Sequence, residues 1–157
     1  MNKNFKPFFN KLLLLESTQL TNIPDDDGGL TCCGISKVFW PEWEGWDRLR
    51  GSYGDVSKPF TKRMVYDRDC FREELLPLVE KFYKEKFWDS VSGDILPSGV
   101  DAYVALAAVN LGVKTACKLL QGTLRVEQDG ILGVKTLTAL NGFTGDSGTT
   151  KDGVEAV

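Results

Sequence analysis

The first hydrophobic stretch of the chain repeats with the period of a helix that buries one face. At about 3.6 residues per turn, Phe5, Phe9 and Leu12 fall on one side, Glu16 continues the same stripe, and Leu14 points the other way. The pattern predicts a helix from Phe5 to about Glu16 with a carboxyl group at its inner end. Because burial disfavours an ionised carboxylate, we expect a raised pKa for Glu16, as a general acid requires near neutral pH. The competing interpretation is a terminal glutamate that turns into solvent.

A polar, turn-rich segment and then a group of aromatic residues follow this helix. We expect a small irregular or β-hairpin lobe from about Asn22 to Ser57. Its aromatic side chains can stack on sugar rings or pack the small lobe onto the helical one, and packing is the commoner role. One or two of them at the edge of a cleft would serve both roles. We name Trp43 and Trp46 as candidates for substrate binding.

The second half of the chain is mainly helical by its periodicity. The charged segment from Thr61 to Trp88 has a helical pattern, in which Pro77 interrupts the helix or opens a new one. The apolar face of its second half is expected to hold Leu75, Leu78, Val79, Phe82 and Tyr83. A further helix is predicted from about Gly99 to Asn110, with Ser98 as its cap and Gly112 as the stop.

A last clear helix is predicted from Lys114 to about Leu124. Its inward-facing residues are expected to be Ala116, Cys117, Leu119, Leu120 and Leu124. Beyond Gly142 bulky apolar residues become scarce, so residues 143–157 are expected to form a flexible tail.

Composition narrows the class of protein. The 157 residues are 42% hydrophobic and 26% charged, which suits one soluble globular domain. A net charge of −3 offers no basic surface for nucleic acid. The longest apolar run, Leu12 to Leu15, is too short for a membrane span or for the core of a signal peptide. We expect a monomer without nucleic-acid partners, stable membrane insertion or a signal peptide.

Histidine and cysteine usage excludes several kinds of catalytic site. The chain has no histidine, which removes Ser-His and Cys-His mechanisms and most zinc hydrolase designs. Its four cysteines are Cys32, Cys33, Cys70 and Cys117, with no CxxC spacing, and the adjacent pair cannot form an ordinary disulfide. We therefore expect reduced, mostly buried thiols, no metal and no cofactor.

Three polar residues near the first helix have the spacing Glu-x8-Asp-x5-Thr, formed by Glu16, Asp25 and Thr31. This arrangement resembles the active site of phage-type lysozymes, and the residues around it resemble glycoside hydrolase family 108. Members of that family carry Glu-Gly-Gly-Tyr, Asp-x-Gly-Gly-x-Thr and Gly-Ile. Here the corresponding residues read Glu-Ser-Thr-Gln at 16–19, Asp-Asp-Gly-Gly-Leu-Thr at 26–31 and Gly-Ile at 34–35.

Two departures from the family pattern affect the predicted site. Ser17 and Thr18 replace the glycines, which would allow a tight turn or close approach of a sugar. The segment is also one residue longer than usual. Counting forward from Glu16 selects Asp25 as the second carboxylate, whereas counting back from the two glycines selects Asp26. We favour Asp25 and keep Asp26 as the alternative.

A second block of similarity lies in the C-terminal half. Residues 93–99 read Gly-Asp-Ile-Leu-Pro-Ser-Gly, close to the family's Gly-Asp-x-Leu-Pro-x-Gly, and 129–136 resemble the Asp-Gly-x-x-Gly-x-x-Thr turn of peptidoglycan-binding repeats. Such a turn mainly fixes helix geometry, with direct sugar contact as the alternative. We expect one catalytic domain over residues 1–142, whose part from about 90 resembles the family's peptidoglycan-binding region. Asn110 is a third candidate for substrate binding.

The resemblance implies an α+β, mainly α-helical, lysozyme-like fold with a small irregular or β-hairpin lobe, a helical lobe and a cleft between them. It also implies an N-acetylmuramidase, or phage endolysin, that cleaves the β-1,4 bond between N-acetylmuramic acid and N-acetylglucosamine in bacterial peptidoglycan. Glu16 would be the general acid, Asp25 or Asp26 the base, and Thr31 would hold the attacking water, which predicts inversion. Such an enzyme would be made in the host cytoplasm and reach the wall through a holin or on a particle.

Two alternatives stay open from the sequence. A lytic transglycosylase would use a single glutamate and leave 1,6-anhydro ends. A non-catalytic peptidoglycan-binding protein on a lysozyme-like scaffold is a different class, favoured by the lost glycines and opposed by the joint presence of Glu16, Asp25 and Thr31.

Overall fold

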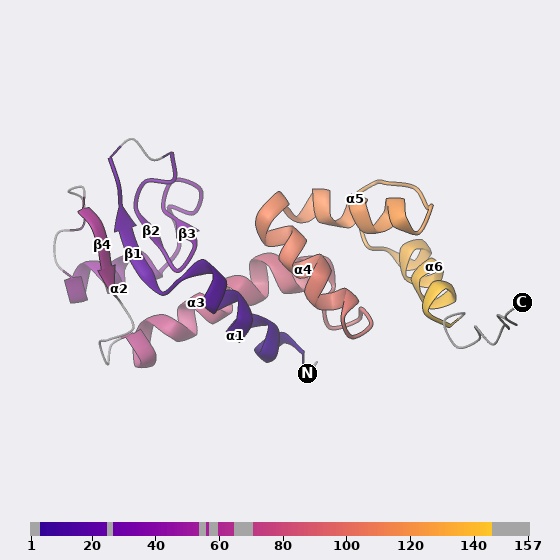
Figure 1. The fold of residues 1–157 in the computed structure, drawn as a ribbon, viewed down its shortest axis with the longest axis horizontal. Helices are drawn as coiled ribbons and strands as arrows, with labels where there is room; N and C mark the ends of the chain where they lie inside the picture. Colours follow the sequence, from indigo (N-terminus) through magenta and orange to yellow (C-terminus); the bar gives the residue numbers. More distant parts are fainter. Residues whose placement is uncertain (1–3, 25–26, 54–55, 57–59, 65–70, 146–157) are drawn as a thin grey trace, which may run out of the picture. The chain divides into compact units, whose positions relative to one another are not determined.

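The computed structural model shows an α+β protein that is mainly helical, as predicted (Figure 1). It describes residues 4–24, 27–53, 56, 60–64 and 71–145. Contacts between residues divide the chain into two compact units, Met1–Asp89 and Ser90–Val157. Among the described residues, no helix is long and apolar enough to cross a membrane.

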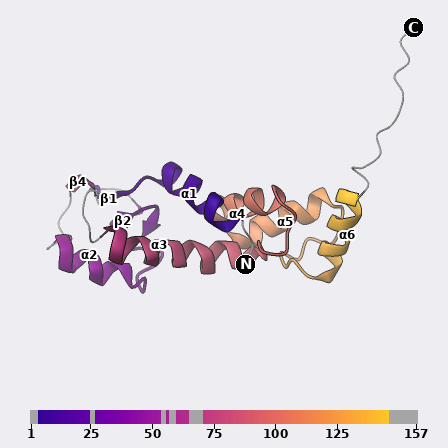
Figure 2. The same cartoon turned by 90° about the horizontal axis from the view of Figure 1, so that it is seen from below.

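The first unit begins with the predicted amphipathic helix, α1, over Phe5–Glu16. Its buried face includes Phe9 and Leu12, whereas Leu14 is 84% exposed, so the predicted orientation is confirmed. The helix crosses the line of α3 (Leu76–Tyr83) in Figure 1 and lies to one side of it in Figure 2. Aromatic contacts hold the pair together, with the rings of Phe9 and Tyr83 6.2 Å apart.

A small antiparallel sheet follows α1 and forms the predicted hairpin lobe. Its strands are β1 (Gln19–Asn22), β2 (Thr31–Cys32), β3 (Ile35–Ser36) and β4 (Phe60–Met64), in the order β3-β2-β1-β4. The register pairs Cys32 with both Leu20 and Ile35, so the centre of the sheet is buried and apolar. Strand β4 contradicts the predicted helical start at Thr61. Its local pattern is weak, and the strand is defined by pairing with the distant β1.

A helix within the aromatic segment was not predicted. Helix α2 covers Gly45–Tyr53 and buries Trp46 and Leu49, which lie three residues apart on one face. Two glycines and the dense aromatic residues gave this segment the composition of a loop, which obscured the short helical repeat.

The next helical region confirms the role predicted for Pro77. A π-helical turn, η1 (Phe71–Leu75), leads into α3, where Pro77 occupies the first turn and requires no N–H partner. A second π-helical turn, η2 (Lys84–Trp88), and a 3-10 turn, η3 (Asp89–Val91), follow. The predicted apolar face is confirmed for Leu75, Val79, Phe82 and Tyr83, which are buried, while Leu78 is partly exposed.

Up to residue 145, where its described part ends, the second unit contains the α-helices α4 (Val100–Leu111), α5 (Val113–Thr123) and α6 (Val134–Gly145). Gly112 ends α4 at φ 86°, as predicted. The predicted cap Ser98 is wrong, because the Asp101 carboxylate instead accepts hydrogen bonds from the backbone N–H groups of Gly99 and Ala102. A carboxylate in the first turn also suits the helix dipole.

The residues predicted to face inward from α5 are only partly confirmed. Ala116 and Cys117 are buried as expected, but Leu119 is 54% exposed and Gln121 is buried in its place. The described cysteines Cys32, Cys33 and Cys117 are free and buried, as predicted, while Cys70 lies outside the described residues. The predicted tail is wrong for residues 143–145, which continue helix α6, and residues 146–157 lie outside the described residues.

Candidate active site

Glu16 ends α1 on the same side as the buried residues Phe9 and Leu12. It is partly buried, and burial raises the pKa of its carboxyl group above the ordinary value. In the described part of the chain, no group donates a hydrogen bond to this carboxylate, so nothing there offsets the cost of desolvation. The predicted direction of the pKa shift is confirmed, and the environment favours a carboxyl group that can donate a proton.

The residue after Glu16 has an unusual backbone conformation. Ser17 lies at φ 69° and ψ 151°, a region that essentially only glycine occupies without strain. The chain must turn sharply there to pass from α1 into β1 at Gln19. The turn that a glycine would make is thus retained with a serine, at a cost in conformational energy.

A tight hairpin turn packs against the Glu16 carboxyl group. Cys33 and Gly34, at φ 51° and 79°, connect β2 to β3 in the two-residue geometry that requires positive φ at both positions. A Cβ atom on Gly34 would lie 2.5 Å from Glu16 Oε2 and 2.5 Å from the Tyr83 hydroxyl oxygen. Only glycine therefore lets the turn, the carboxyl group and the phenol meet.

Thr31 lies on the same hairpin, at the start of β2. Its hydroxyl is directed at the backbone carbonyls of Gly28 and Gly29, at 3.4 and 3.3 Å. The Ser36 hydroxyl donates a stronger hydrogen bond to the Gly28 carbonyl, at 2.7 Å, and ties the glycine turn to β3. Antiparallel pairing of Thr31 with Thr21 brings together the two ends of the loop that carries the predicted second carboxylate.

The two candidates for that second carboxylate, Asp25 and Asp26, lie outside the described residues. Their assignment stays a prediction. The neighbouring Asp27 is described and is exposed.

Comparison with known proteins agrees with this arrangement. The family model described as Glycosyl hydrolase 108 matches residues 9–112, a span that contains most of α1, with Glu16, and all of the hairpin and α3. The chain belongs to glycosyl hydrolase family 108. It is therefore a glycoside hydrolase, and the membership supports a peptidoglycan-degrading, lysozyme-like function.

A solved structure is also similar to this chain. The structure of SagA from Brucella abortus matches with a TM-score of 0.60 and 28% sequence identity, covering 88% of this chain and 69% of that one. No curated protein matches the chain.

The two tryptophans proposed as substrate contacts are largely buried in this family 108 chain. Trp46 is 4% exposed, and its indole N–H donates to the Trp40 carbonyl at 2.8 Å. Trp43 is 8% exposed and meets Trp46 edge to face, with centroids 4.9 Å apart. Both tryptophans pack in the interior, which is one of the two roles considered for them. The other role, stacking on sugar rings of the substrate, stays a prediction.

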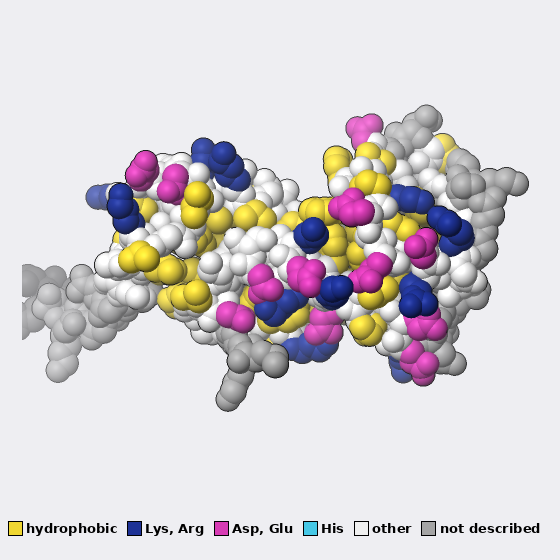
Figure 3. All heavy atoms as spheres, turned by 180° about the vertical axis from the view of Figure 1, so that it is seen from behind, with side chains coloured by type: hydrophobic (Ala, Val, Ile, Leu, Met, Phe, Trp, Pro, Cys, Tyr) yellow, Lys and Arg dark blue, Asp and Glu magenta, His cyan; other side chains and the backbone are white. Residues whose placement is uncertain are grey.

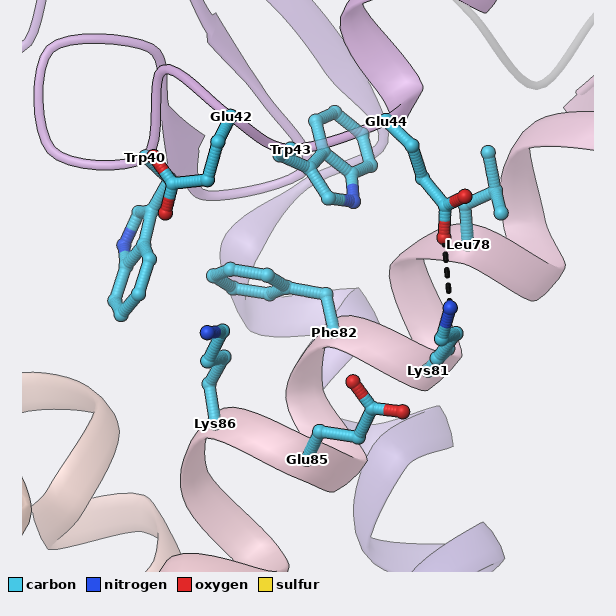
Figure 4. Close-up of a pocket in the computed structure, with 9 residues that line it drawn as sticks. All are labelled: Trp40, Glu42, Trp43, Glu44, Leu78, Lys81, Phe82, Glu85 and Lys86. Atoms are coloured by element: carbon cyan, nitrogen blue, oxygen red, sulfur yellow. Dashed lines mark hydrogen bonds and ion pairs between the residues drawn. The ribbon is translucent and has the colours of Figure 1, made fainter.

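Trp43 also borders a surface pocket of about 300 Å³ (Figure 4). The indole packs edge to face on Phe82, with ring centroids 6.3 Å apart, and the ion pair of Lys81 with Glu44, 2.9 Å long, borders the pocket on one side. The remaining lining residues are Trp40, Glu42, Leu78, Glu85 and Lys86. Glu16 and Thr31 do not line it, so the pocket is separate from these two predicted catalytic residues.

The third predicted substrate contact, Asn110, belongs to the second unit. It is exposed and donates from its side-chain amide to the Leu106 carbonyl, at 2.9 Å. Its role in substrate binding stays a prediction.

The Asp129 turn is held by a buried glutamine. Gln121 is 1% exposed and donates to the Asp129 carboxylate at 2.6 Å, to the Ile131 carbonyl at 2.9 Å and to Thr136, while its amide oxygen accepts from the Gly130 N–H at 2.8 Å. The hydrogen bond from Gln121 lowers the pKa of Asp129, and the Ile131 N–H lowers it further. The sequence resemblance located this turn, but the buried glutamine that organises it was not predicted.

Acidic and basic side chains are mixed on the face of the molecule drawn in Figure 3. Pairs such as Lys6 with Glu80 and Lys84 with Asp89 leave little local charge excess in the first unit. Among the described residues, no three His, Cys, Asp or Glu side chains come together in a way that would hold a metal ion.

Proposed function

We propose that the protein is an N-acetylmuramidase that hydrolyses the β-1,4 bond between N-acetylmuramic acid and N-acetylglucosamine in peptidoglycan, with inversion. The observation that carries the proposal is the partly buried Glu16 carboxyl group, packed against the exposed turn at Gly34. A glycoside hydrolase requires a group that stays protonated until the leaving oxygen needs a proton. The Glu16 carboxyl group meets this requirement, because it is partly desolvated and receives no hydrogen bond from a described residue that would stabilise its ionised form.

In the proposed reaction, Glu16 donates its proton to the glycosidic oxygen as the bond from that oxygen to the anomeric carbon breaks. The ring carbon then has oxocarbenium character and is attacked by water from the opposite face. Asp25, or Asp26 in the alternative alignment, accepts one hydrogen of this water.

Thr31 is proposed to orient the same water. Because its hydroxyl proton is directed at the carbonyls of Gly28 and Gly29, its lone pairs are available to accept the second hydrogen of the water. An oxygen lone pair of the water is then left for attack on the anomeric carbon.

The test is digestion of purified peptidoglycan with mass spectrometry of the products, comparing wild type, Glu16→Gln and the matched surface variant Glu127→Gln. We expect reducing N-acetylmuramic acid ends from wild type and Glu127→Gln. Glu16→Gln is expected to lose about 10³-fold or more in rate, in the upper range for loss of a general acid, while remaining folded. Full activity of Glu16→Gln would overturn the assignment.

The same experiment separates the alternatives. Products with 1,6-anhydro ends, together with tolerance of a double Asp25→Asn and Asp26→Asn variant, would identify a lytic transglycosylase. Wall binding without any products would identify a non-catalytic binding protein.

A further inference from the structure

Tyr83 lies close to Glu16 but was predicted only as part of an apolar helix face. Its hydroxyl oxygen and Glu16 Oε2 each lie 2.5 Å from the point where a Cβ of Gly34 would be. The two oxygens are therefore no farther apart than twice that distance. Residues from α1, the β2–β3 turn and α3 converge at this one point.

The phenol is fixed in position. Tyr83 is 1% exposed, and its ring packs against Phe9, Phe82 and Phe87 at centroid distances of 6.2, 5.4 and 5.7 Å. Its hydroxyl donates a hydrogen bond of 2.8 Å to the Cys33 carbonyl. The single phenolic proton is thus committed to the hairpin turn, and the oxygen retains only lone pairs for its other neighbours.

A lone pair on the Tyr83 hydroxyl oxygen interacts differently with the ionised and the protonated forms of Glu16. An ionised carboxylate has no hydrogen to offer and is repelled by the phenol oxygen, whereas a protonated carboxyl group can donate to it. We propose, as a refinement that rests on the proposed function, that Tyr83 is a positioning residue whose hydroxyl oxygen favours the protonated form of Glu16 and sets the direction of its O–H bond.

The electrostatic surroundings agree with this arrangement. Burial raises the pKa of Tyr83 far above its usual value, and the nearby Glu16 raises it further, as do Cys33 and Cys32. The phenol therefore stays neutral over the whole range in which Glu16 titrates. These are the titratable groups that act on Tyr83 in the described part of the first unit.

The proposal is tested by the pH dependence of kcat/KM for Tyr83→Phe on soluble peptidoglycan fragments. Loss of the acceptor is expected to lower the pKa of Glu16, so the basic limb of the profile moves to lower pH. At pH values above the pKa of Glu16, kcat/KM is expected to fall about 3- to 10-fold, because lowering this pKa by one unit reduces the protonated fraction of Glu16 about tenfold there. At pH values below this pKa, kcat/KM of the variant should stay within about twofold of the wild-type value. The matched control is Tyr103→Phe, at a tyrosine that is 79% exposed, and it should leave the profile in place.

A loss of equal size at every pH, or a basic limb that is unmoved or shifted upward, would overturn the positioning role. If Tyr83→Phe does not fold, replacement of the four tyrosines by 3-fluorotyrosine preserves the ring packing and weakens the phenol oxygen as an acceptor. The Glu16 pKa is then expected to fall in the same direction, and an unchanged pKa would refute the proposal.

A second readout does not depend on catalysis. The pKa of Glu16 can be followed by NMR in protein labelled with ¹³C at the glutamate carboxyl groups, with Glu16→Gln to assign the signal. A lower pKa in Tyr83→Phe supports the coupling even if the wild type cleaves no glycan, which would contradict only the muramidase proposal. Cleavage by the wild type together with an unchanged Glu16 pKa in the variant would contradict the positioning role alone.

Discussion

Two carboxyl groups, one in each compact unit, have opposite environments. Glu16, at the end of α1, is partly buried, receives no hydrogen bond from a described residue and has its pKa raised by burial. Asp129, in the turn before α6, is exposed, accepts hydrogen bonds from Gln121 and the Ile131 N–H, and has its pKa lowered. The environment of Glu16 favours a protonated carboxyl group that can act as a proton donor, whereas that of Asp129 favours a carboxylate that holds the turn together through hydrogen bonds.

The two shifts also have opposite effects on stability. Because the folded-state pKa of Glu16 is raised, the native state binds its proton more tightly, and stability is lost as the pH rises through that pKa. Because the folded-state pKa of Asp129 is lowered, its contribution is complete above the ordinary value of 3.8 and is lost as the pH falls through the folded-state pKa. At neutral pH the proposed catalytic group therefore costs stability, and the structural one supplies it.

Apart from loss of the Glu16 carboxyl group itself, the largest expected effect comes from adding one methyl group at a glycine in each region. Gly34→Ala places a Cβ atom 2.5 Å from both Glu16 Oε2 and the Tyr83 hydroxyl, so the carboxyl group must move. Misplacing a reacting group by about 1 Å can cost about 10²-fold, and we expect kcat/KM to fall by about that factor. The measurement is the rate of peptidoglycan cleavage at a temperature where thermal unfolding shows the variant to be folded.

Gly130→Ala is the matched comparison, because Gly130 has a similar φ of 83°. A Cβ atom there would lie 2.7 Å from Lys114 Cγ and 3.2 Å from the Lys114 carbonyl oxygen, so Lys114 must shift. We expect a stability loss of about 1–2 kcal/mol from the positive φ and a further loss from this shift, with kcat/KM within about twofold. Equal loss of activity in both variants would show that the Gly34 contact has no special part in the reaction.

A smaller effect is expected from removing the group that holds Asp129 as an anion. Gln121→Met keeps the approximate volume but leaves the Gly130 N–H and the Ile131 carbonyl without this partner. Unsatisfied buried polar groups cost about 1–3 kcal/mol. Because these two backbone groups are only partly buried, we expect a stability loss at the lower end of that range, measured by chemical denaturation. The pKa of Asp129 should also return towards its ordinary value, so the part of the stability loss on acidification that comes from Asp129 becomes smaller.

Gln128→Met is the control for this variant, since Gln128 is an exposed glutamine in the same unit. It should leave both the stability and its pH dependence nearly unchanged. A Gln121→Met protein as stable as wild type would mean that water replaces the amide without cost, and the Asp129 turn would then owe its shape to the backbone alone.

The sequence predicted those parts of the fold that depend on local pattern. The stripe from Phe5 to Glu16 fixed α1 and placed the carboxyl group correctly, because helix period and burial act within one element. Strand β4 was not predicted, since it is defined by antiparallel pairing with β1, about forty residues earlier. The short helix α2 was obscured by its glycines and aromatic residues.

The site was predicted in the same uneven way. Glu16 and Thr31 were proposed from their spacing, and their catalytic roles stay predictions. The proximity of Tyr83 to Glu16 was not predicted, because it arises between segments far apart in the sequence, as does the hydrogen bond of Tyr83 to Cys33, fifty residues away. Such a contact leaves no local periodicity. The available signal was Gly34, a glycine in a hairpin next to the predicted acid, where close approach of another group is a common reason for glycine.

The smallest expected effect concerns strain, which also separates the two regions. In the Asp129 turn the left-handed position is occupied by Gly130, whereas beside Glu16 Ser17 occupies φ 69° and ψ 151°. Strain of this kind costs about 1–3 kcal/mol, and glycine gives back about 0.5–1 kcal/mol through the entropy of the unfolded chain. We therefore expect Ser17→Gly to stabilise the protein by about 1 kcal/mol, measured by chemical denaturation. Ser17→Ala, which removes the hydroxyl but keeps the strain, should give no gain. A gain of equal size in Ser17→Ala would attribute the effect to the hydroxyl group and would remove the physical reason for a glycine after the proposed general acid.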